Sequence, residues 1–179
     1  MRRPSTVRHA LLGAALLASA LAPSVATAQA TVPRFGVAFQ GLLAVPDGLG
    51  IGGRVRAATA LNPDISLALD LGGVAFIAGS KSRADFAFEP QVSAIINVGE
   101  GRLRDPVGQS SNAYILAGLG AYLPTGNDAP SGGLTLHGGV GFVQPLNASS
   151  LFYEFNPALV VRGKNDVGFL IPVRVGLIF

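Results

Sequence analysis

The chain has 179 residues, of which 49% are hydrophobic and only 13% are charged, and its formal net charge is +3. This length suits one domain rather than two, and the charged fraction is about half of the ~25% found in a typical soluble protein. The absence of cysteine excludes disulfides, thiolate chemistry and a lipid-modified cysteine. No unbroken apolar run approaches the roughly 18 residues of a membrane-spanning helix, so the apolar residues are dispersed and their period indicates the fold.

The N-terminal segment has the three-part pattern of a secretory signal peptide. A basic segment (1–9) precedes a 13-residue Ala/Leu run (10–22), and a small-x-small pattern ends at Ala28. The sequence therefore predicts a signal peptide over residues 1–28, with cleavage before Gln29. The alternative is a permanent N-terminal anchor.

Cleavage changes the charge balance. The segment takes three arginines with it and leaves ten basic and ten acidic residues, so the remaining chain is formally neutral. A nucleic-acid partner would require a basic patch on that remaining domain. The charge therefore gives no support to nucleic-acid binding.

After the predicted cleavage site, eight segments show the period-two alternation of β-strands, in which successive side chains point to opposite faces. Turn-forming sequences such as Pro46-Asp47-Gly48 and Asn62-Pro63-Asp64 separate them. The predicted strands cover about residues 34–45, 50–61, 65–78, 86–98, 112–123, 133–144, 151–161 and 167–179.

The two faces of these strands differ in chemistry. One carries large apolar side chains, whereas the other carries small and polar side chains and few charges. A soluble barrel or β-sandwich, the alternative class, would need a charged exterior that the second face is too poor in charge to provide. That face suits the crowded interior of a small barrel. The apolar face is then predicted to meet lipid, where every backbone N–H and C=O needs a partner and the sheet must close.

The segment at 112–123 is apolar on both faces, so alternation does not orient it. Tyr114 and Tyr122 share one of its faces, eight residues apart. At ~3.3 Å per residue and a tilt near ~40°, this separation is about 20 Å along the membrane normal. We interpret the two tyrosines as candidates for the two aromatic girdles of a membrane barrel.

The last predicted strand is the most regular, with apolar residues at every second position up to Phe179. Eight strands, 151 residues after cleavage and this last strand together resemble the small outer-membrane β-barrels of Gram-negative bacteria, the OmpA/OmpX-like group. The resemblance covers residues 29–179 and is one of pattern rather than of a motif. In such proteins the terminal aromatic residue and its strand form the signal that the outer-membrane insertion machinery reads. The resemblance gives this role to Ile171, Val173, Val175, Leu177 and Phe179.

Three prolines fall inside predicted strands, at Pro90, Pro157 and Pro172. Each removes a backbone donor from the hydrogen-bond ladder. We therefore expect bulges or strand ends at these positions.

Four short connections would be extracellular if both termini are periplasmic, and the longest connection, 99–111, would then be periplasmic. Two of the short connections contain Lys81, Arg83, Arg162 and Lys164, which either contact lipopolysaccharide phosphates or only solvate the loops. The four short connections are 46–49, 79–85, 124–132 and 162–166.

Six charged residues, three basic and three acidic, fall on the predicted interior face. Balanced signs suit a narrow lumen, because an unpaired buried charge is very costly. A turn centred on Pro63 would place Arg56 opposite Asp70, and Glu154 and Arg174 lie on neighbouring strands. We interpret the set as an internal ion-pair network that plugs the barrel. A gated or selective pore is the alternative, although eight strands leave space for side chains rather than a water column. The six residues are Arg54, Arg56, Asp70, Glu89, Glu154 and Arg174.

Catalysis would require a nucleophile and a base within hydrogen-bond reach, as in the Ser/His/Glu site of outer-membrane barrels that deacylate lipid A. His137 is the only histidine after the predicted cleavage site, and Gly138-Gly139 follows it rather than the His-x-Ser spacing of that family. It could meet Ser93 or Thr135, but no pattern points to either pair. One histidine and no cysteine also argue against a transition-metal site. We predict no enzymatic activity, no cofactor and no bound metal.

The sequence thus predicts an all-β, eight-stranded antiparallel up-and-down transmembrane barrel over 29–179, in the cell outer membrane, with a structural role in envelope integrity. Expected partners are outer-membrane lipid and lipopolysaccharide, with the insertion machinery and periplasmic chaperones during biogenesis; we expect a monomer. Two other functions stay open. A conduit or binder for small hydrophobic molecules, as in OmpW-like barrels, would need an open apolar lumen. A lipid A-modifying enzyme would lose activity on His137→Ala.

Overall fold

The chain forms a closed, antiparallel β-barrel in the computed structural model, which describes residues 32–79, 85–98, 103–104, 110–127, 129–163 and 166–179. The predicted signal peptide (1–28) lies outside these residues. Within the described part of the chain, no helix is long and apolar enough to cross a membrane.

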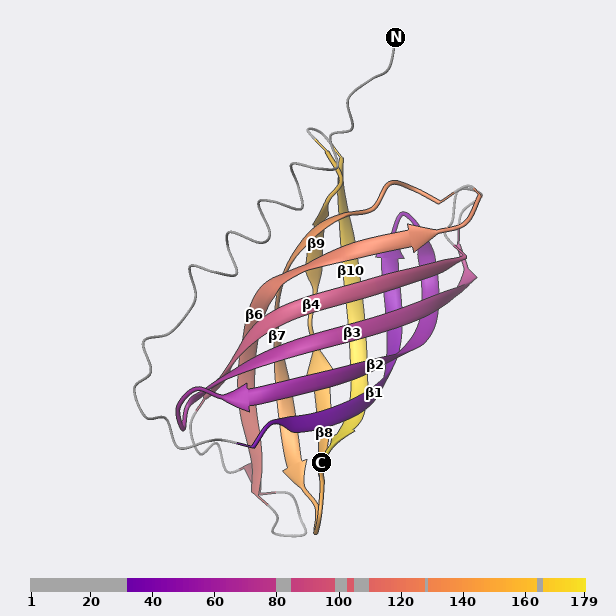
Figure 1. The fold of residues 1–179 in the computed structure, drawn as a ribbon. Helices are drawn as coiled ribbons and strands as arrows, with labels where there is room; N and C mark the ends of the chain where they lie inside the picture. Colours follow the sequence, from indigo (N-terminus) through magenta and orange to yellow (C-terminus); the bar gives the residue numbers. More distant parts are fainter. Residues whose placement is uncertain (1–31, 80–84, 99–102, 105–109, 128, 164–165) are drawn as a thin grey trace. The chain divides into compact units, whose positions relative to one another are not determined.

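The strands of the barrel follow the predicted segments closely, with two additions. The predicted strand 151–161 is divided into β8 and β9, and a short additional strand, β5, pairs with β6. In chain order the strands are β1 (Arg34–Val45), β2 (Gly48–Ala60), β3 (Ile65–Ala78), β4 (Phe86–Asn97), β5 (Leu103–Arg104), β6 (Ser110–Thr125), β7 (Gly133–Pro145), β8 (Ser150–Phe155), β9 (Ala158–Val161) and β10 (Val167–Ile178) (Figure 1).

The wall is an up-and-down barrel of eight strand positions. The strands β6, β4, β3, β2 and β1 lie side by side and tilted in Figure 1, and β1 then pairs with β10. The two halves β8 and β9 fill one position between β10 and β7, and β7 pairs with β6 to complete the ring. All these pairs are antiparallel. The predicted fold class is therefore confirmed.

Two turns show how local sequence sets the register. Gly48 has a φ of +119°, a backbone conformation that favours glycine, directly after the turn between β1 and β2. Between β2 and β3, the side-chain Oδ1 of Asn62 accepts hydrogen bonds from the backbone N–H groups of Asp64 (2.9 Å) and Ile65 (2.7 Å). This Asx turn fixes the hairpin so that Arg56 faces Asp70.

The three prolines behave differently from one another. Pro157 lies in the break between β8 and β9, which is an expected strand end. Pro90 and Pro172 lie inside the continuous strands β4 and β10 without a register shift, so the expectation of a bulge or end there is wrong. The physical reason is that each faces an interrupted ladder. Pairing of β4 with β6 lapses between Phe88 and Gln91, and Pro172 faces the break between β8 and β9.

The outer face of the barrel carries the large apolar side chains, as the alternation predicts. They are exposed on the wall strands, and the interior positions between them are buried. Representative exposed residues are Phe39, Val55, Leu69, Val92, Leu119, Leu136, Phe155 and Phe169.

The interpretation of Tyr114 and Tyr122 as girdle residues is wrong. Both side chains point into the barrel, where they are 4% and 0% exposed. They do share a face, but it is the inner face of β6, which alternation could not identify in a segment that is apolar on both sides.

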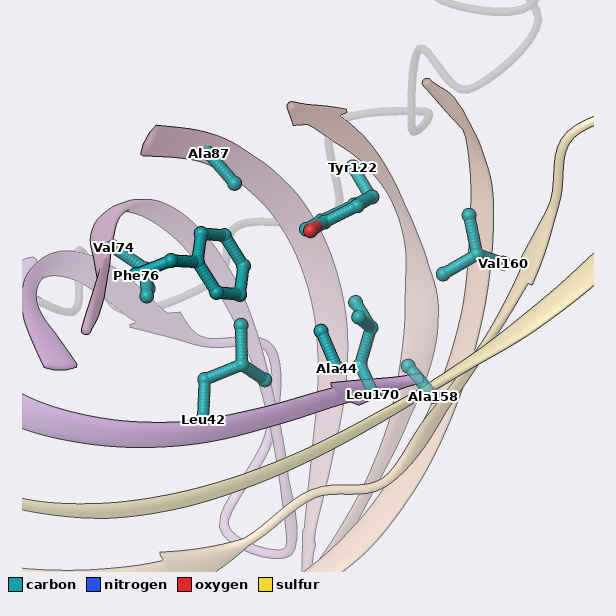
Figure 2. Packing of buried hydrophobic residues seen from close by; sticks show 9 residues of the cluster. All are labelled: Leu42, Ala44, Val74, Phe76, Ala87, Tyr122, Ala158, Val160 and Leu170. Carbon is teal, nitrogen blue, oxygen red and sulfur yellow. The ribbon is translucent and has the colours of Figure 1, made fainter. Parts of the chain in front are cut away.

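A layer of apolar side chains fills the interior near the connections β1–β2, β3–β4, β6–β7 and β9–β10, an end of the barrel that we call the loop end. The opposite end, where β1 begins and β10 finishes, we call the terminus end. Figure 2 shows Leu42, Phe76 and Tyr122 of this layer pointing into the space that the strands enclose. The apolar layer consists of Leu42, Ala44, Val74, Phe76, Ala87, Tyr122, Ala158, Val160 and Leu170.

Candidate functional site in the barrel interior

The six charged residues assigned to the inner face are all buried inside the barrel, on the terminus-end side of the apolar layer. They come from β2, β3, β4, β8 and β10. We call these six residues, together with Gln40 and Gln91, the charged layer. The six charged residues are Arg54, Arg56, Asp70, Glu89, Glu154 and Arg174.

One half of the charged layer is a chain of alternating charge. Arg56 donates from Nε to Oδ1 of Asp70 at 2.8 Å, its partner across the β2–β3 hairpin. Its Nη1 lies 2.9 Å from Oε2 of Glu154 on β8, and the other carboxylate oxygen of Glu154 accepts from Arg174 on β10. Tyr114 also donates to Glu154, at 3.1 Å. Each interior charge in this chain therefore contacts a charge of opposite sign.

In the other half, two arginines approach each other with glutamine oxygens between them. The Oε1 of Gln40 accepts from Nε of Arg54 (3.1 Å) and from Nε of Arg174 (2.8 Å). The Oε1 of Gln91 accepts from the same two guanidinium groups, at 3.1 and 3.3 Å. Glu89 balances this pair, since its Oε2 accepts from Nη2 of Arg54 and from the amide of Gln40, both at 2.7 Å.

These contacts join strands that are not neighbours in the wall. The Arg54–Glu89 pair links β2 to β4, the Arg56–Glu154 pair links β2 to β8, and the bond from Arg174 to Gln91 links β10 to β4. Charges removed from water cost several kcal/mol each unless they are paired. The network therefore holds opposite walls together, and it is sensitive to the loss of any member.

Glycines on the inner face make room for these large side chains. A Cβ at Gly72, which faces Arg54 across the hairpin, would stand 2.8 Å from Nη2 of Arg54. A Cβ at Gly141 would overlap the ring of its cross-strand partner Tyr114. The small residues of the inner face are thus required by the size of the charged and aromatic ones.

A second polar cluster, which the sequence did not reveal, lies at the loop end. Asp47 is fully buried, and its Oδ2 accepts from the hydroxyl of Tyr122 (2.6 Å) and from Nη2 of Arg162 (3.2 Å). The Arg162 guanidinium also lies 5.8 Å from the centre of the Tyr122 ring. The interpretation of Arg162 as a residue that contacts lipopolysaccharide or solvates a loop is therefore wrong. Lys81, Arg83 and Lys164 lie outside the described residues.

The one histidine of the described chain meets a serine. Ser93 on β4 and His137 on β7 flank Gly118 on β6, and Oγ of the serine lies 2.9 Å from Nε2 of the histidine. A Cβ at Gly118 would stand 2.7 Å from that nitrogen, so the glycine permits the contact. Both side chains are buried, and Nδ1 of His137 has no partner among the described residues. A nucleophile–base pair needs a group that orients the base, and no described residue hydrogen-bonds to Nδ1 of His137. The described residues also contain no group of three side chains that could hold a metal ion.

Comparison with known proteins identifies the fold. No family model matches the sequence, and no curated protein matches it. The crystal structure of Neisserial surface protein A (NspA) is similar, with a TM-score of 0.63 and 16% identity over 82% of this chain and 95% of that one. The N-terminal β-barrel domain of Pseudomonas aeruginosa OprF has a TM-score of 0.51 and 17% identity, over 82% of this chain and 97% of that domain. The predicted resemblance to small eight-stranded outer-membrane barrels is thus confirmed at the level of the fold.

Proposed function

We propose that this chain is an exported outer-membrane barrel with a structural role in the envelope and a closed interior. The observation that carries the proposal is the inverted distribution of side chains. Leu119 on the outer face is 65% exposed, whereas Arg174 inside is 1% exposed. A continuous apolar exterior of this kind marks a surface that meets lipid or a partner rather than water.

The length of the strands fits a bilayer. At ~3.3 Å per residue and a tilt of about 40°, the 12 residues of β1 reach about 30 Å along the barrel axis. That reach covers the ~25 Å apolar band of outer-membrane barrels. Closure of the sheet gives each of the eight strand positions a paired neighbour on both sides, as a lipid environment requires, although the ladder between β4 and β6 lapses between Phe88 and Gln91.

The two layers of the interior support a structural role over a conduit. Val74, Tyr122 and Val160 in the apolar layer are fully buried, so no water-sized space adjoins them. The paired charges fill the next layer. A binder or conduit for small hydrophobic molecules would need this apolar layer to be open.

A non-enzymatic role is also part of the proposal. Ser93 and His137 are both buried, and no described residue hydrogen-bonds to Nδ1 of His137 to orient it as a base. Replacement of His137 by Ala should therefore leave lipid A acylation in the host membrane unchanged. Loss of a lipid A modification in that variant would support the lipid-modifying enzyme instead.

The proposal for how the barrel is inserted into the membrane rests on the last strand, β10. The outward-facing side chains of β10, followed by Phe179, are the proposed signal for the insertion machinery. The other proposed partners are lipid, lipopolysaccharide and periplasmic chaperones. The barrel is proposed to be a monomer. Because β10 pairs with β1, it is also the strand that closes the ring. We expect Phe179→Ala to lower the amount of folded barrel in the membrane, with Val32→Ala, another exposed apolar position beside the terminus end, as the control. The residues of the signal are Ile171, Val173, Val175, Leu177 and Phe179.

Heat-modifiability on a denaturing gel tests location and closure together. Outer-membrane fractions extracted in mild detergent should give a band that migrates differently before and after boiling, because an unheated barrel stays compact. A protein found soluble in the periplasm, with no shift, would contradict the proposal and reverse the assignment of the two faces.

A further inference from the structure

The interior is hollow at the terminus end. A cavity of about 560 Å³ opens there and leads into a recess of about 110 Å³. The recess reaches Arg56 and Tyr114 at the edge of the charged layer. Four residues line both spaces, which therefore adjoin each other: Arg34, Ala58, Ser66 and Asn97.

The lining of this cavity is cationic. Among the described residues, the lining contains no Asp or Glu side chain and two arginines, Arg34 at the mouth and Arg56 at the base. Arg34 occupies an inner-face position of β1 and takes part in no ion pair with the described residues. The charge of Arg56 is already matched by Asp70 and Glu154. Among the described residues, no Asp or Glu side chain therefore pairs with Arg34.

A second observation is a buried donor of Arg56 that has no acceptor among the described residues. The side chain of Arg56 is 5% exposed, and its Nη2 has no hydrogen-bond partner among the described residues. A buried guanidinium nitrogen without an acceptor is costly. An acceptor in the recess that Arg56 lines would satisfy this donor, and a negatively charged acceptor would also balance Arg34.

The remaining walls of the recess indicate the size and polarity of the rest of the ligand. Apart from the arginines and the polar side chains of Ser66, Asn97 and Tyr114, they are apolar or small: Phe35, Gly36, Ala58, Ile95, Val143 and Ile178. At ~30 Å³ per water molecule, the recess of about 110 Å³ holds about four water-sized groups. These walls favour a ligand with a short apolar chain over inorganic phosphate, which has no apolar part.

We propose that the terminus-end cavity binds a small monoanionic carboxylate with a short apolar chain. The carboxylate accepts hydrogen bonds from Arg34 and from Nη2 of Arg56, and the chain lies against Ile95, Val143 and Ile178. Binding neutralises the unpaired charge and satisfies the buried donor in one step. The proposal concerns only the barrel interior, so it does not depend on where the barrel resides.

Titration of the folded protein in detergent micelles tests the site, with butyrate as the probe and amide chemical shifts as the readout. We expect saturable shifts at Ala58, Ser66 and Asn97, and weaker binding of acetate, which lacks most of the apolar chain. Butyramide, a neutral molecule of the same shape, should bind at least ~10-fold more weakly, because its carbonyl accepts weaker hydrogen bonds from the guanidinium groups than a carboxylate does and does not balance their charge.

Two variants locate the binding. Arg34→Gln should weaken butyrate binding at least ~10-fold, and Ala58→Phe, which fills the passage between the two spaces, should abolish it. Lys164→Gln is the matched control, because it removes the same unit of charge in the connection between β9 and β10. Both test variants should keep the heat-dependent gel shift, which shows that they fold.

Three results would overturn the inference. Equal shifts with butyrate and butyramide would show that the cavity does not recognise charge. Tighter binding of inorganic phosphate than of butyrate would show that the ligand class is wrong. An absence of saturable shifts, or equal weakening by Arg34→Gln and Lys164→Gln, would show that the cavity holds only solvent or a segment of the chain itself.

Discussion

The interior of the barrel contains two layers of side chains, which rely on different physics. In the apolar layer, Leu42, Phe76 and Leu170 pack by shape and exclude water without directional bonds. In the charged layer, Arg54 and Glu154 depend on partners at specific atoms, several of them on strands across the barrel. We therefore expect a substitution in the apolar layer to lower the unfolding free energy in proportion to the side-chain volume that it removes. The charged layer fails abruptly, because removing one member leaves another charge buried and unpaired.

The largest effect is expected where one carboxylate serves two arginines. Glu154→Ala leaves both Arg56 and Arg174 short of a counterion. The barrel should lose about 3–5 kcal/mol of unfolding free energy, measured by urea unfolding in detergent micelles. A loss below about 1 kcal/mol would show that water already compensates these charges.

A somewhat smaller loss is expected in the apolar layer. Leu170→Ala removes a fully buried side chain that packs with Leu42 and Val160, and should cost about 2–4 kcal/mol in the same assay. Leu119→Ala, at a position exposed on the outer face, is the control and should cost less. Equal costs at the two positions would contradict a packed layer.

A double-mutant cycle separates the two layers by mechanism. Arg54→Met and Glu89→Leu should each destabilise the barrel, whereas the combined variant should recover about 2 kcal/mol, since no unpaired charge remains. The corresponding cycle in the apolar layer, Leu42→Ala with Leu170→Ala, should show no such recovery. Additive costs for Arg54→Met and Glu89→Leu would refute the directional character of the charged layer.

The smallest effect comes from the glycines that make room for the arginines. Gly72→Ala places a methyl group against the Arg54 guanidinium and should cost about 1–2 kcal/mol. Gly41→Ala, in β1, meets no atom within 4 Å and should be neutral. Equal stability of the two variants would mean that Arg54 can move away without loss.

Sequence alone identified the strands and their faces because period-two alternation continues through almost every segment. The same parity assigned the six charged residues to the inner face, and the Asn62–Asp64 turn fixed the register that pairs Arg56 with Asp70. Alternation and turn sequences therefore predict the faces of the strands and the residues that pair between neighbouring strands.

The errors arose where those rules do not apply. Tyr114 and Tyr122 lie in a segment whose two faces are both apolar, so alternation could not tell its inner face from its outer face. Arg162 follows β9, and its side chain turns inward to Asp47. Alternation assigns no face to a residue outside a strand, so it could not predict this orientation. The bridging by Gln40 and Gln91 depends on which positions of distant strands lie at the same height in the ring, and pairwise registers do not reveal this.

The central claim is that the apolar face meets lipid, and the absence of tryptophan from the chain gives it a direct test. A single tryptophan introduced by Leu119→Trp on the outer face of β6 reports on its surroundings when the barrel is reconstituted with brominated phospholipids. Asn147→Trp, at an exposed position between β7 and β8, is the matched control. The account predicts strong quenching of fluorescence at position 119 and weak quenching at 147. Equal, weak quenching at both positions would contradict it and place the apolar face away from lipid.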